Sequence, residues 1–252
     1  MMADLQPVGF ETKSSGTMNK EFDQVAWDEK LERDCRQLVQ LAIREDLDGR
    51  PDVTTESLIS PECQGRAAVV VRQAGVICGL QAASIALDEM GGTVALTAEV
   101  ADGEALSADT PFALITGPAR HLLTAERLVL NLIGRLSGIA TLASEYVRMV
   151  EGTGARIYDT RKTTPGWRRL EKFAVRCGGA TNHRSGLYDA VLIKDNHLAH
   201  VASSSDKGIS PGESIDRART RIAQLAPDRA ERMIIEVEVD SLDQLDDVLP
   251  KG

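Results

Sequence analysis

One segment of the sequence gathers positively charged side chains in a chain that is acidic overall. Residues 156–195 contain nine Lys and Arg residues against four Asp and Glu residues, and nine minus four leaves a local charge of +5. The whole chain of 252 residues carries a net charge of −9. Cations gathered in this way indicate a site for a small anion, although a solvated face of Lys and Arg would give the same composition.

The cations of this segment follow predicted strands. Residues 156–159 read as a short strand, so Arg161 and Lys162 come just after a strand end. Residues 188–193 form a second apolar strand, and Lys194 follows it directly. Because α/β folds place ligand-binding groups just beyond the carboxyl ends of successive strands, these positions favour a binding site over a solvated face.

A third predicted strand, residues 234–239, carries acidic residues. Ile234, Glu236 and Glu238 share one of its faces by the two-residue period of a strand. Two acids on one face of a buried parallel strand are costly unless they bind something or are paired. Both are therefore candidates for binding, with a paired structural role as the alternative.

Several motifs in the chain closely resemble those of the quinolinate phosphoribosyltransferases, also called nicotinate-nucleotide pyrophosphorylases (carboxylating). The motifs are, in chain order, Glu45-Asp46-Leu47, Asp52-Val53-Thr54-Thr55, Glu126-Arg127 with Asn131, 159–166 (DTRKTTPG), Gly178-Gly179, Asn182-His183-Arg184, 193–197 (IKDNH) and 236–239 (EVEV). They cover roughly residues 38 to 250, and several motifs in register are far more specific than any one of them.

The resemblance implies a reaction. A phosphoribosyl group would pass from phosphoribosyl pyrophosphate to quinolinate, and loss of the 2-carboxylate as CO₂ would give nicotinate mononucleotide and pyrophosphate, in de novo NAD biosynthesis. The transition state of such a transfer has cationic ribose character. The protein must therefore hold two anions, neutralise the departing one and leave the sugar near carboxylates.

The resemblance also assigns residues to these tasks. Planar guanidinium groups can grip the two carboxylates of quinolinate bidentately, and Arg127, Arg161 and Arg184 are the candidates, with His183 helping. Compact ammonium groups suit phosphate and pyrophosphate oxygens. The expected catalytic residues are Lys162, Lys194 and Glu238, and the expected substrate-binding residues are Arg127, Arg161, Lys162, His183, Arg184, Lys194 and Glu238.

Magnesium is the one cofactor that we expect. Glu238, and Glu236 as a second candidate, would bind Mg²⁺ or the ribose hydroxyls, because Mg²⁺ prefers oxygen ligands and bridges phosphates. His197 and His200 stand three residues apart, but no third ligand is visible, so a loop or capping role is the better prediction for them.

A long predicted helix that opens at Thr124 carries Arg127. Leu and Ile occupy this helix nearly all round, so it must be buried within the protomer or against a second one. A buried Arg needs a charged partner, and a salt-bridged structural role is one interpretation of Arg127. The resemblance implies another, in which Arg127 enters the active site of the neighbouring subunit of a homodimer.

Composition bears on partners and compartment. Aromatic residues make up only 4% of the chain and the pI is near 5.1, which argues against a nucleic-acid partner. No apolar run approaches the roughly 20 residues that span a bilayer, so no membrane partner is expected. Four cysteines without a paired spacing indicate reduced thiols and a cytoplasmic protein.

The predicted fold class is α/β. We expect a disordered leader (1–23), an N-terminal α+β sandwich-like domain (24–123), and an α/β barrel domain (124–252) of the type II phosphoribosyltransferase kind. The resemblance implies further strands, with an Asp, a Gly-rich phosphate loop and a Thr-His pair, which are absent here. The barrel is therefore expected to be incomplete and open, with its C-terminal strands missing. Residues 201–213 are expected to form a polar loop.

Other functions fit parts of the pattern. A Lys just after a barrel strand, as at Lys194, could form a Schiff base in a lyase, although such a Lys needs apolar surroundings. A non-catalytic dimer, or a fragment, that only binds pyridine carboxylates or phosphates is a second alternative. A related pyridine or metal-transport-associated paralogue is a third.

Overall fold

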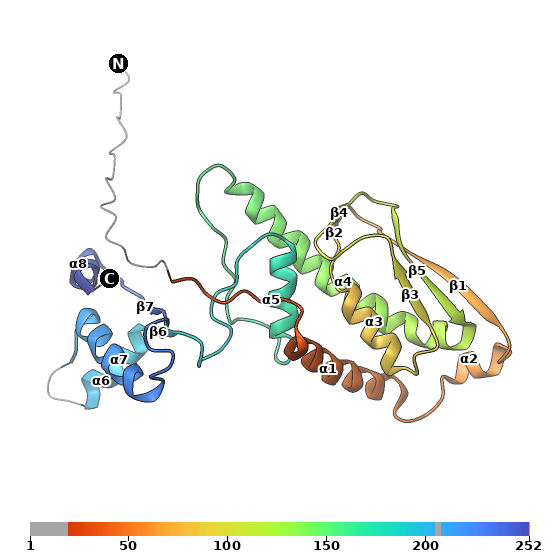
Figure 1. Cartoon of the computed structure of the whole chain (residues 1–252), viewed down its shortest axis with the longest axis horizontal. Coiled ribbons are helices and arrows are strands. Elements are labelled where there is room, and N and C mark those ends of the chain that lie inside the picture. Colours follow the sequence, from red (N-terminus) through yellow and green to blue (C-terminus); the bar gives the residue numbers. More distant parts are fainter. Residues whose placement is uncertain (1–19, 205–207, 252) are drawn as a thin grey trace, which may run out of the picture. The chain divides into compact units, whose positions relative to one another are not determined.

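The computed structural model describes residues 20–204 and 208–251. The chain forms two compact units, a large one from Phe22 to Asp189 and a small one that contains residues 190–251 (Figure 1). Within the described residues, no helix is long and apolar enough to cross a membrane. The leader expected at residues 1–23 lies almost entirely outside the described residues, and the predicted domain boundary at residue 124 stays a prediction.

The large unit opens with helix α1 (Glu29–Leu47). The Asp28 carboxylate begins the helix by accepting a hydrogen bond from the Leu31 N–H at 2.7 Å. Asp48 ends it with a left-handed backbone (φ 47°). At helical spacing the sequence supplies an apolar face, and this face is buried: Leu31, Cys35 and Val39. A short helix, α2 (Val53–Leu58), follows.

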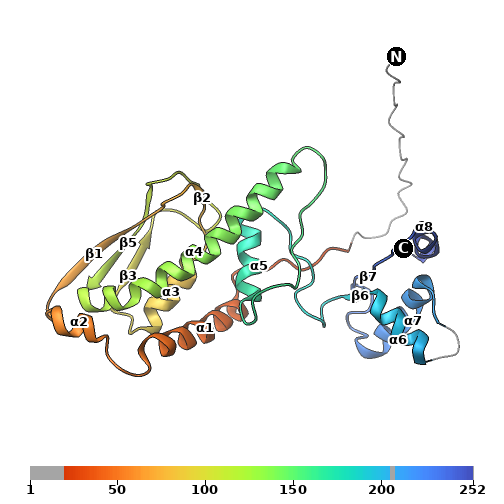
Figure 2. The same ribbon diagram turned by 180° about the vertical axis from the view of Figure 1, so that it is seen from behind.

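An antiparallel sheet forms the next layer, as Figure 2 shows from behind. Its strand order is β1-β5-β3, with β1 Gln64–Val70, β5 Pro111–Pro118 and β3 Ala95–Ala98. A second pair joins β2 (Gly75–Val76) to β4 (Ala105–Leu106). Strands and helices thus mix in this part of the chain as the sequence predicted.

Helix α4 (Ala119–Met149) is 31 residues long and packs with α3 (Leu80–Glu89). The prediction that this helix begins at Thr124 is wrong. The Thr124 hydroxyl lies one turn inside the helix, and its single hydrogen has two acceptors within reach, the Arg120 carbonyl at 2.9 Å and Asp52 Oδ2 at 3.2 Å. Gly134 and Gly138 lie inside this helix without breaking it, because its packed face supports a continuous run.

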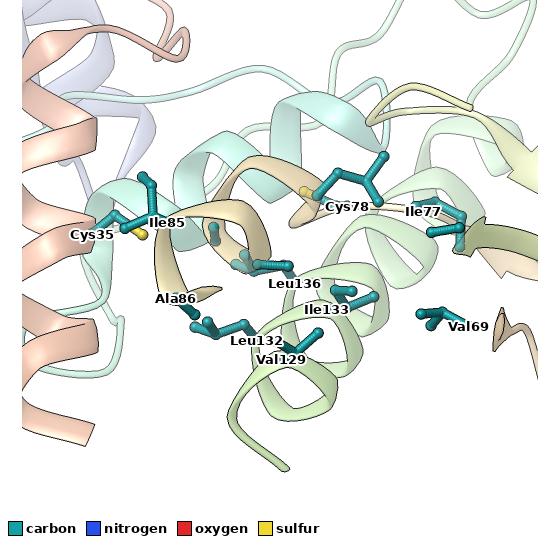
Figure 3. Packing of buried hydrophobic residues seen from close by; sticks show 14 of the residues in the cluster. Cys35, Val69, Ile77, Cys78, Ile85, Ala86, Val129, Leu132, Ile133 and Leu136 are labelled. Atoms are coloured by element: carbon teal, nitrogen blue, oxygen red, sulfur yellow. The ribbon is translucent and has the colours of Figure 1, made fainter. Parts of the chain in front are cut away.

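The core of the large unit lies between the sheet and helices α3 and α4, and it continues into the buried face of α1, which packs on α3. Figure 3 shows side chains of this cluster from close by. The α4 residues that contribute are Ala125, Leu128, Val129, Leu132, Ile133, Leu136 and Ala140. Leu130 and Leu142 of the same helix are 38% and 55% exposed. This chain therefore buries only one face of the apolar helix.

Helix α5 (Arg168–Cys177) packs against α4 and α1. The sequence predicted a strand at residues 156–159, but the structure gives only an isolated parallel bridge between Tyr158 and Thr181. The strand expected at residues 188–193 is shorter too, since β6 covers only Val191–Ile193.

The small unit has its own parallel pair, β6 and β7 (Ile235–Val237). The helices around it are α6 (Asp195–Ser204), α7 (Pro211–Leu225) and α8 (Leu242–Val248), and a 3-10 turn follows at Leu249–Lys251. The loop expected at residues 201–213 is helical at both ends, because Ser210 and Glu213 form a capping box that begins α7 early. The mixed α/β class is confirmed.

Candidate active site

The loop that follows Asp159 holds the first predicted cations. Thr160 Oγ1 accepts a hydrogen bond from the Lys162 N–H at 3.0 Å, which turns the chain back on itself. Lys162 is exposed, whereas Arg161 is half-buried. Arg161 Nε is buried and finds no hydrogen-bond partner among the described residues. Because a buried N–H without an acceptor is costly, this guanidinium suits an anionic ligand.

A cavity of about 500 Å³ opens beside Arg161. Its charged lining residues are Lys30, Asp34, Arg161, Arg168 and Arg169. Arg169 is already paired, at 2.9 Å with Asp28 and 3.4 Å with Asp34, and Arg168 Nε donates to Thr163 Oγ1 at 3.1 Å. The cavity therefore has an excess of positive charge, as an anion site requires.

The segment after α5 carries His183 and Arg184. It leaves the helix through Gly178 and Gly179, where a Cβ on Gly178 would lie 2.2 Å from the Ala140 carbonyl oxygen. Gly179 takes a φ of +84°, which favours glycine. The Gly-Gly pair thus has a structural reason: it lets the chain pass close to α4 before reaching the predicted site residues.

His183 and Arg184 then meet a buried polar network that the sequence did not predict. Asp159 accepts hydrogen bonds from Lys172 Nζ at 2.5 Å, from Asn182 Nδ2 at 2.8 Å and from the His183 N–H at 2.8 Å. Lys172 and Asn182 are 1% and 0% exposed, and Arg184 is 7% exposed. Burial lowers the pKa of Lys172, and the Asp159 carboxylate opposes that shift.

No sequence signal pointed to Lys172. It stands among Arg168, Arg169, Glu171 and Arg176, so nothing in the composition of this charge-rich helix distinguishes it. The signal for Asn182 was its place in a motif, which gave no role. Only the packed structure shows that both are buried partners of Asp159.

In the small unit, a cation and a carboxylate follow the two parallel strands. Lys194 comes directly after β6 and Glu238 directly after β7, and Lys194 Nζ lies 2.6 Å from Glu238 Oε1. Their side chains are 39% and 49% exposed. Glu236 lies within β7, half-buried and aligned with Leu192. The structure thus brings Lys194 and Glu238 together at the carboxyl ends of neighbouring strands, where α/β folds bind ligands.

His197 caps a helix, which is one of the two roles predicted for it. Its Nδ1 accepts a hydrogen bond from the Lys194 N–H at 2.9 Å at the beginning of α6. Among the described residues, no group of three or more His, Cys, Asp and Glu side chains could hold a metal ion. His200 therefore belongs to no group of possible metal ligands among the residues that the structure describes.

Arg127 lies exposed on α4, with no ion pair to any residue that the structure describes. It is therefore not the buried, salt-bridged Arg that one interpretation required. Five predicted site residues belong to the large unit: Arg127, Arg161, Lys162, His183 and Arg184. Three belong to the small unit: Lys194, Glu236 and Glu238.

Two family models match the chain. One, described as the N-terminal domain of quinolinate phosphoribosyl transferase, matches residues 52–137, and the other, its C-terminal domain, matches residues 139–252. The nicotinate-nucleotide pyrophosphorylase [carboxylating] of Mycobacterium leprae is 42% identical over 217 residues, which are 85% of this chain and 71% of the relative. A probable enzyme of the same name from Bacillus subtilis is 38% identical over 81% of this chain and 65% of its own length.

Solved structures of other proteins point to the same family as the sequence relatives. The nicotinate-nucleotide pyrophosphorylase of Francisella tularensis superimposes with a TM-score of 0.77 at 30% identity, covering 91% of this chain and 75% of that one. The corresponding protein of Ehrlichia chaffeensis gives 0.71 at 31% identity, covering 85% and 73%. The family predicted from the motifs, and with it the phosphoribosyltransferase class, is confirmed. With Lys194 placed directly after β6 and both halves of the chain matched in order, this chain belongs to the quinolinate phosphoribosyltransferase family.

Proposed function

We propose that this chain transfers the phosphoribosyl group of phosphoribosyl pyrophosphate to quinolinate and releases CO₂, giving nicotinate mononucleotide and pyrophosphate. The observation that carries the proposal is the 2.6 Å pair of Lys194 and Glu238 beyond the ends of β6 and β7. A cation and a carboxylate side by side suit a reaction in which an anion departs from a sugar that gains positive charge.

Quinolinate would bind to the cations of the large unit. Arg161 has a buried Nε without a described partner, so a carboxylate that accepts from it would remove an existing cost. Arg184, which is 7% exposed, offers a guanidinium in surroundings where a charged hydrogen bond is strong. His183 follows Asn182 directly and would assist the same ligand.

Phosphoribosyl pyrophosphate would be bound by Lys162, Lys194 and Glu238. Both lysines are partly or fully exposed, as a phosphate-binding ammonium group must be. Before the substrate arrives, Glu238 keeps Lys194 paired, and phosphate oxygens would then compete for the same ammonium group. Lys194 would thereby neutralise the departing pyrophosphate while Glu238 stays near the sugar.

Magnesium would enter with the substrate. Glu238 offers one carboxylate, and Glu236 is a half-buried neighbour on the same strand. Mg²⁺ is commonly held by one or two carboxylates together with substrate phosphates and water. When bound, Mg²⁺ would neutralise charge on the pyrophosphate.

The rival Schiff-base chemistry has less support. A Schiff-base Lys must present a neutral amine in apolar surroundings, whereas Lys194 forms an ion pair in a half-exposed position. Borohydride trapping of a carbonyl substrate on Lys194 would favour the rival and count against the phosphoribosyl transfer.

We also propose an α/β barrel and a homodimer for this chain. β6 and β7 would be neighbouring strands of an α/β barrel, and a homodimer would let Arg127 reach the neighbouring active site. The exposed position of Arg127 and the exposed side chains of Leu130 and Leu142 on α4 support an interface on that helix. A cytoplasmic location fits the four free thiols.

The test is an assay with quinolinate, phosphoribosyl pyrophosphate and Mg²⁺, read by chromatography of nicotinate mononucleotide and pyrophosphate. We expect product from quinolinate and none from nicotinate, since nicotinate lacks the carboxylate that leaves. Omission of Mg²⁺ should abolish turnover. If quinolinate binds without any product, the chain is a binding protein and the proposed reaction is wrong.

A further inference from the structure

The peptide groups on either side of His183 are held by a buried ion pair. The His183 N–H donates to Asp159 Oδ1 at 2.8 Å, and Lys172 Nζ donates to the His183 carbonyl oxygen at 2.8 Å. The two side chains also bind each other, Nζ to Oδ1 at 2.5 Å. The backbone of His183 therefore cannot shift without breaking a buried, charge-assisted hydrogen bond.

This ion pair lies unusually deep. The side chain of Lys172 is 1% exposed and that of Asp159 is 8% exposed. Removing two charges from water is costly, and apolar side chains of similar volume often stabilise a fold as well or better. The pair is therefore a weak source of stability, whereas it fixes closely the geometry of the peptide groups that it binds.

The residue before His183 is held as firmly. Asn182 Nδ2 donates to Asp159 Oδ2 at 2.8 Å and to the Lys172 carbonyl at 2.9 Å, and Asn182 Oδ1 accepts from the Val25 N–H at 2.8 Å. Gln24 binds both the N–H and the carbonyl of Asn182, at 2.8 and 3.1 Å. Each of these groups of Asn182 thus has a fixed partner.

The imidazole ring of His183 has a support of its own. The ring of Phe22 lies 4.2 Å from it, centroid to centroid, with an angle of 32° between the planes. Such a tilted stack restricts the rotation of the imidazole. Phe22 is half-buried and contributes no charge to the network, and its ring also meets the ring of Tyr158 edge-on, with the centroids 6.3 Å apart.

We infer that Asp159, Lys172 and Phe22 are positioning residues, which hold His183 and the adjoining Arg184 in the geometry that receives the quinolinate carboxylates. The inference rests on the proposed function for the identity of the ligand. The three residues act through His183, and none of them is proposed to contact the substrate.

Three variants test the inference, with Asp23→Ala as an exposed neighbouring control. Lys172→Met alone leaves the Asp159 charge buried and unpaired, so the double variant Asp159→Asn/Lys172→Met, which removes both charges, accompanies it. Phe22→Ala leaves the network intact. By calorimetry we expect the Kd for quinolinate to rise at least about 10-fold in the double variant and in Phe22→Ala, with the Kd for phosphoribosyl pyrophosphate within about 2-fold of the wild type.

If the three residues had a purely structural role, their replacement would weaken the binding of both substrates equally or of neither. Equal rises in the two Kd values, or no rise in either, would therefore overturn the inference. Amide hydrogen exchange, followed residue by residue by NMR, tests the geometry without a substrate. We expect the His183 amide to be protected in the wild type and to lose protection in the double variant. Rapid exchange of that amide in the wild type would show that Asp159 and Lys172 do not hold the His183 backbone, and would refute the inference. A wild type that binds no quinolinate would instead refute the proposed function. The exchange result would then still decide whether the His183 backbone is held.

Discussion

Arg184 and Lys194 have different surroundings, although the motifs assign both to substrate. Arg184 is 7% exposed and continues the segment fixed by Asp159, whereas the side chain of Lys194 is 39% exposed and pairs with Glu238. The motifs identified these residues by type and order. They did not identify Lys172, because a buried lysine looks like a surface lysine in a helix rich in charge until the packing is known.

The first prediction concerns these two cations. Arg184→Ala and Lys194→Ala should each lower turnover at least about 100-fold, which is about 2.7 kcal/mol of transition-state stabilisation. The reason is that each change removes a charge from the site where an anion binds or departs. Steady-state kinetics of the purified variants give the result.

Arg176→Ala is the control for this pair, since Arg176 is an exposed cation on α5. It should keep nearly normal turnover. Near-normal kinetics in Arg184→Ala and Lys194→Ala as well would mean that the site residues are assigned incorrectly.

At the scale of elements, the sequence predicted the presence of helices and strands better than their ends. Helix α4 begins at Ala119, while Thr124 with Glu126 had the pattern of a helix start. The true start directly follows Pro118, the last residue of β5, and no side chain caps it, so the usual capping pattern is missing there. The strand expected at residues 156–159 fails for a related reason, since only Tyr158 finds a bridge partner.

Helix α3 offers a prediction on capping and pH. Its N-cap, Gly79, has no side chain, and Asp102 Oδ1 from a distant loop accepts the Gly79 and Leu80 N–H groups at 2.8 and 3.0 Å. Asp102→Ala should lower the free energy of unfolding by about 1 to 2 kcal/mol, because two donors lose their acceptor. Asp102→Asn keeps an acceptor oxygen and should lose less.

Burial raises the pKa of Asp102 above its usual 3.8, against the effect of the two N–H donors. Between the unfolded and the folded pKa, the folded state binds more protons. This contribution to the free energy of unfolding therefore falls as pH rises through that window. Urea unfolding from pH 4 upward should show the fall in the wild type and a smaller one in Asp102→Asn, whereas identical slopes would contradict the assignment to Asp102.

At the scale of the whole molecule, the proposed dimer predicts complementation. Arg127 would serve the partner's site and Arg161 its own, so Arg127→Ala and Arg161→Ala should each be nearly inactive alone. Mixing them under conditions that exchange subunits should restore about a quarter of wild-type activity, because half of the dimers are mixed and each of those holds one intact site.

The control for complementation is a mixture of Arg161→Ala with Arg184→Ala. Both of these residues belong to the same subunit's site, so exchange of subunits should restore nothing. Recovery in this mixture, or none with Arg127→Ala, would refute the donation of Arg127 to a neighbour. Sequence alone could raise this arrangement only by resemblance, because Arg127 shows no local sign of its partner.

The two family models meet at residue 138, in the middle of the unbroken helix α4. The join between the two halves of the family pattern is therefore helical in this chain, with no loop to absorb a change in length. One inserted residue there would turn everything beyond it by about 100° around the helix axis, since a turn holds 3.6 residues. Chimaeras that exchange halves between relatives should therefore keep helical phase across Gly138, and a flexible spacer placed there should be poorly tolerated.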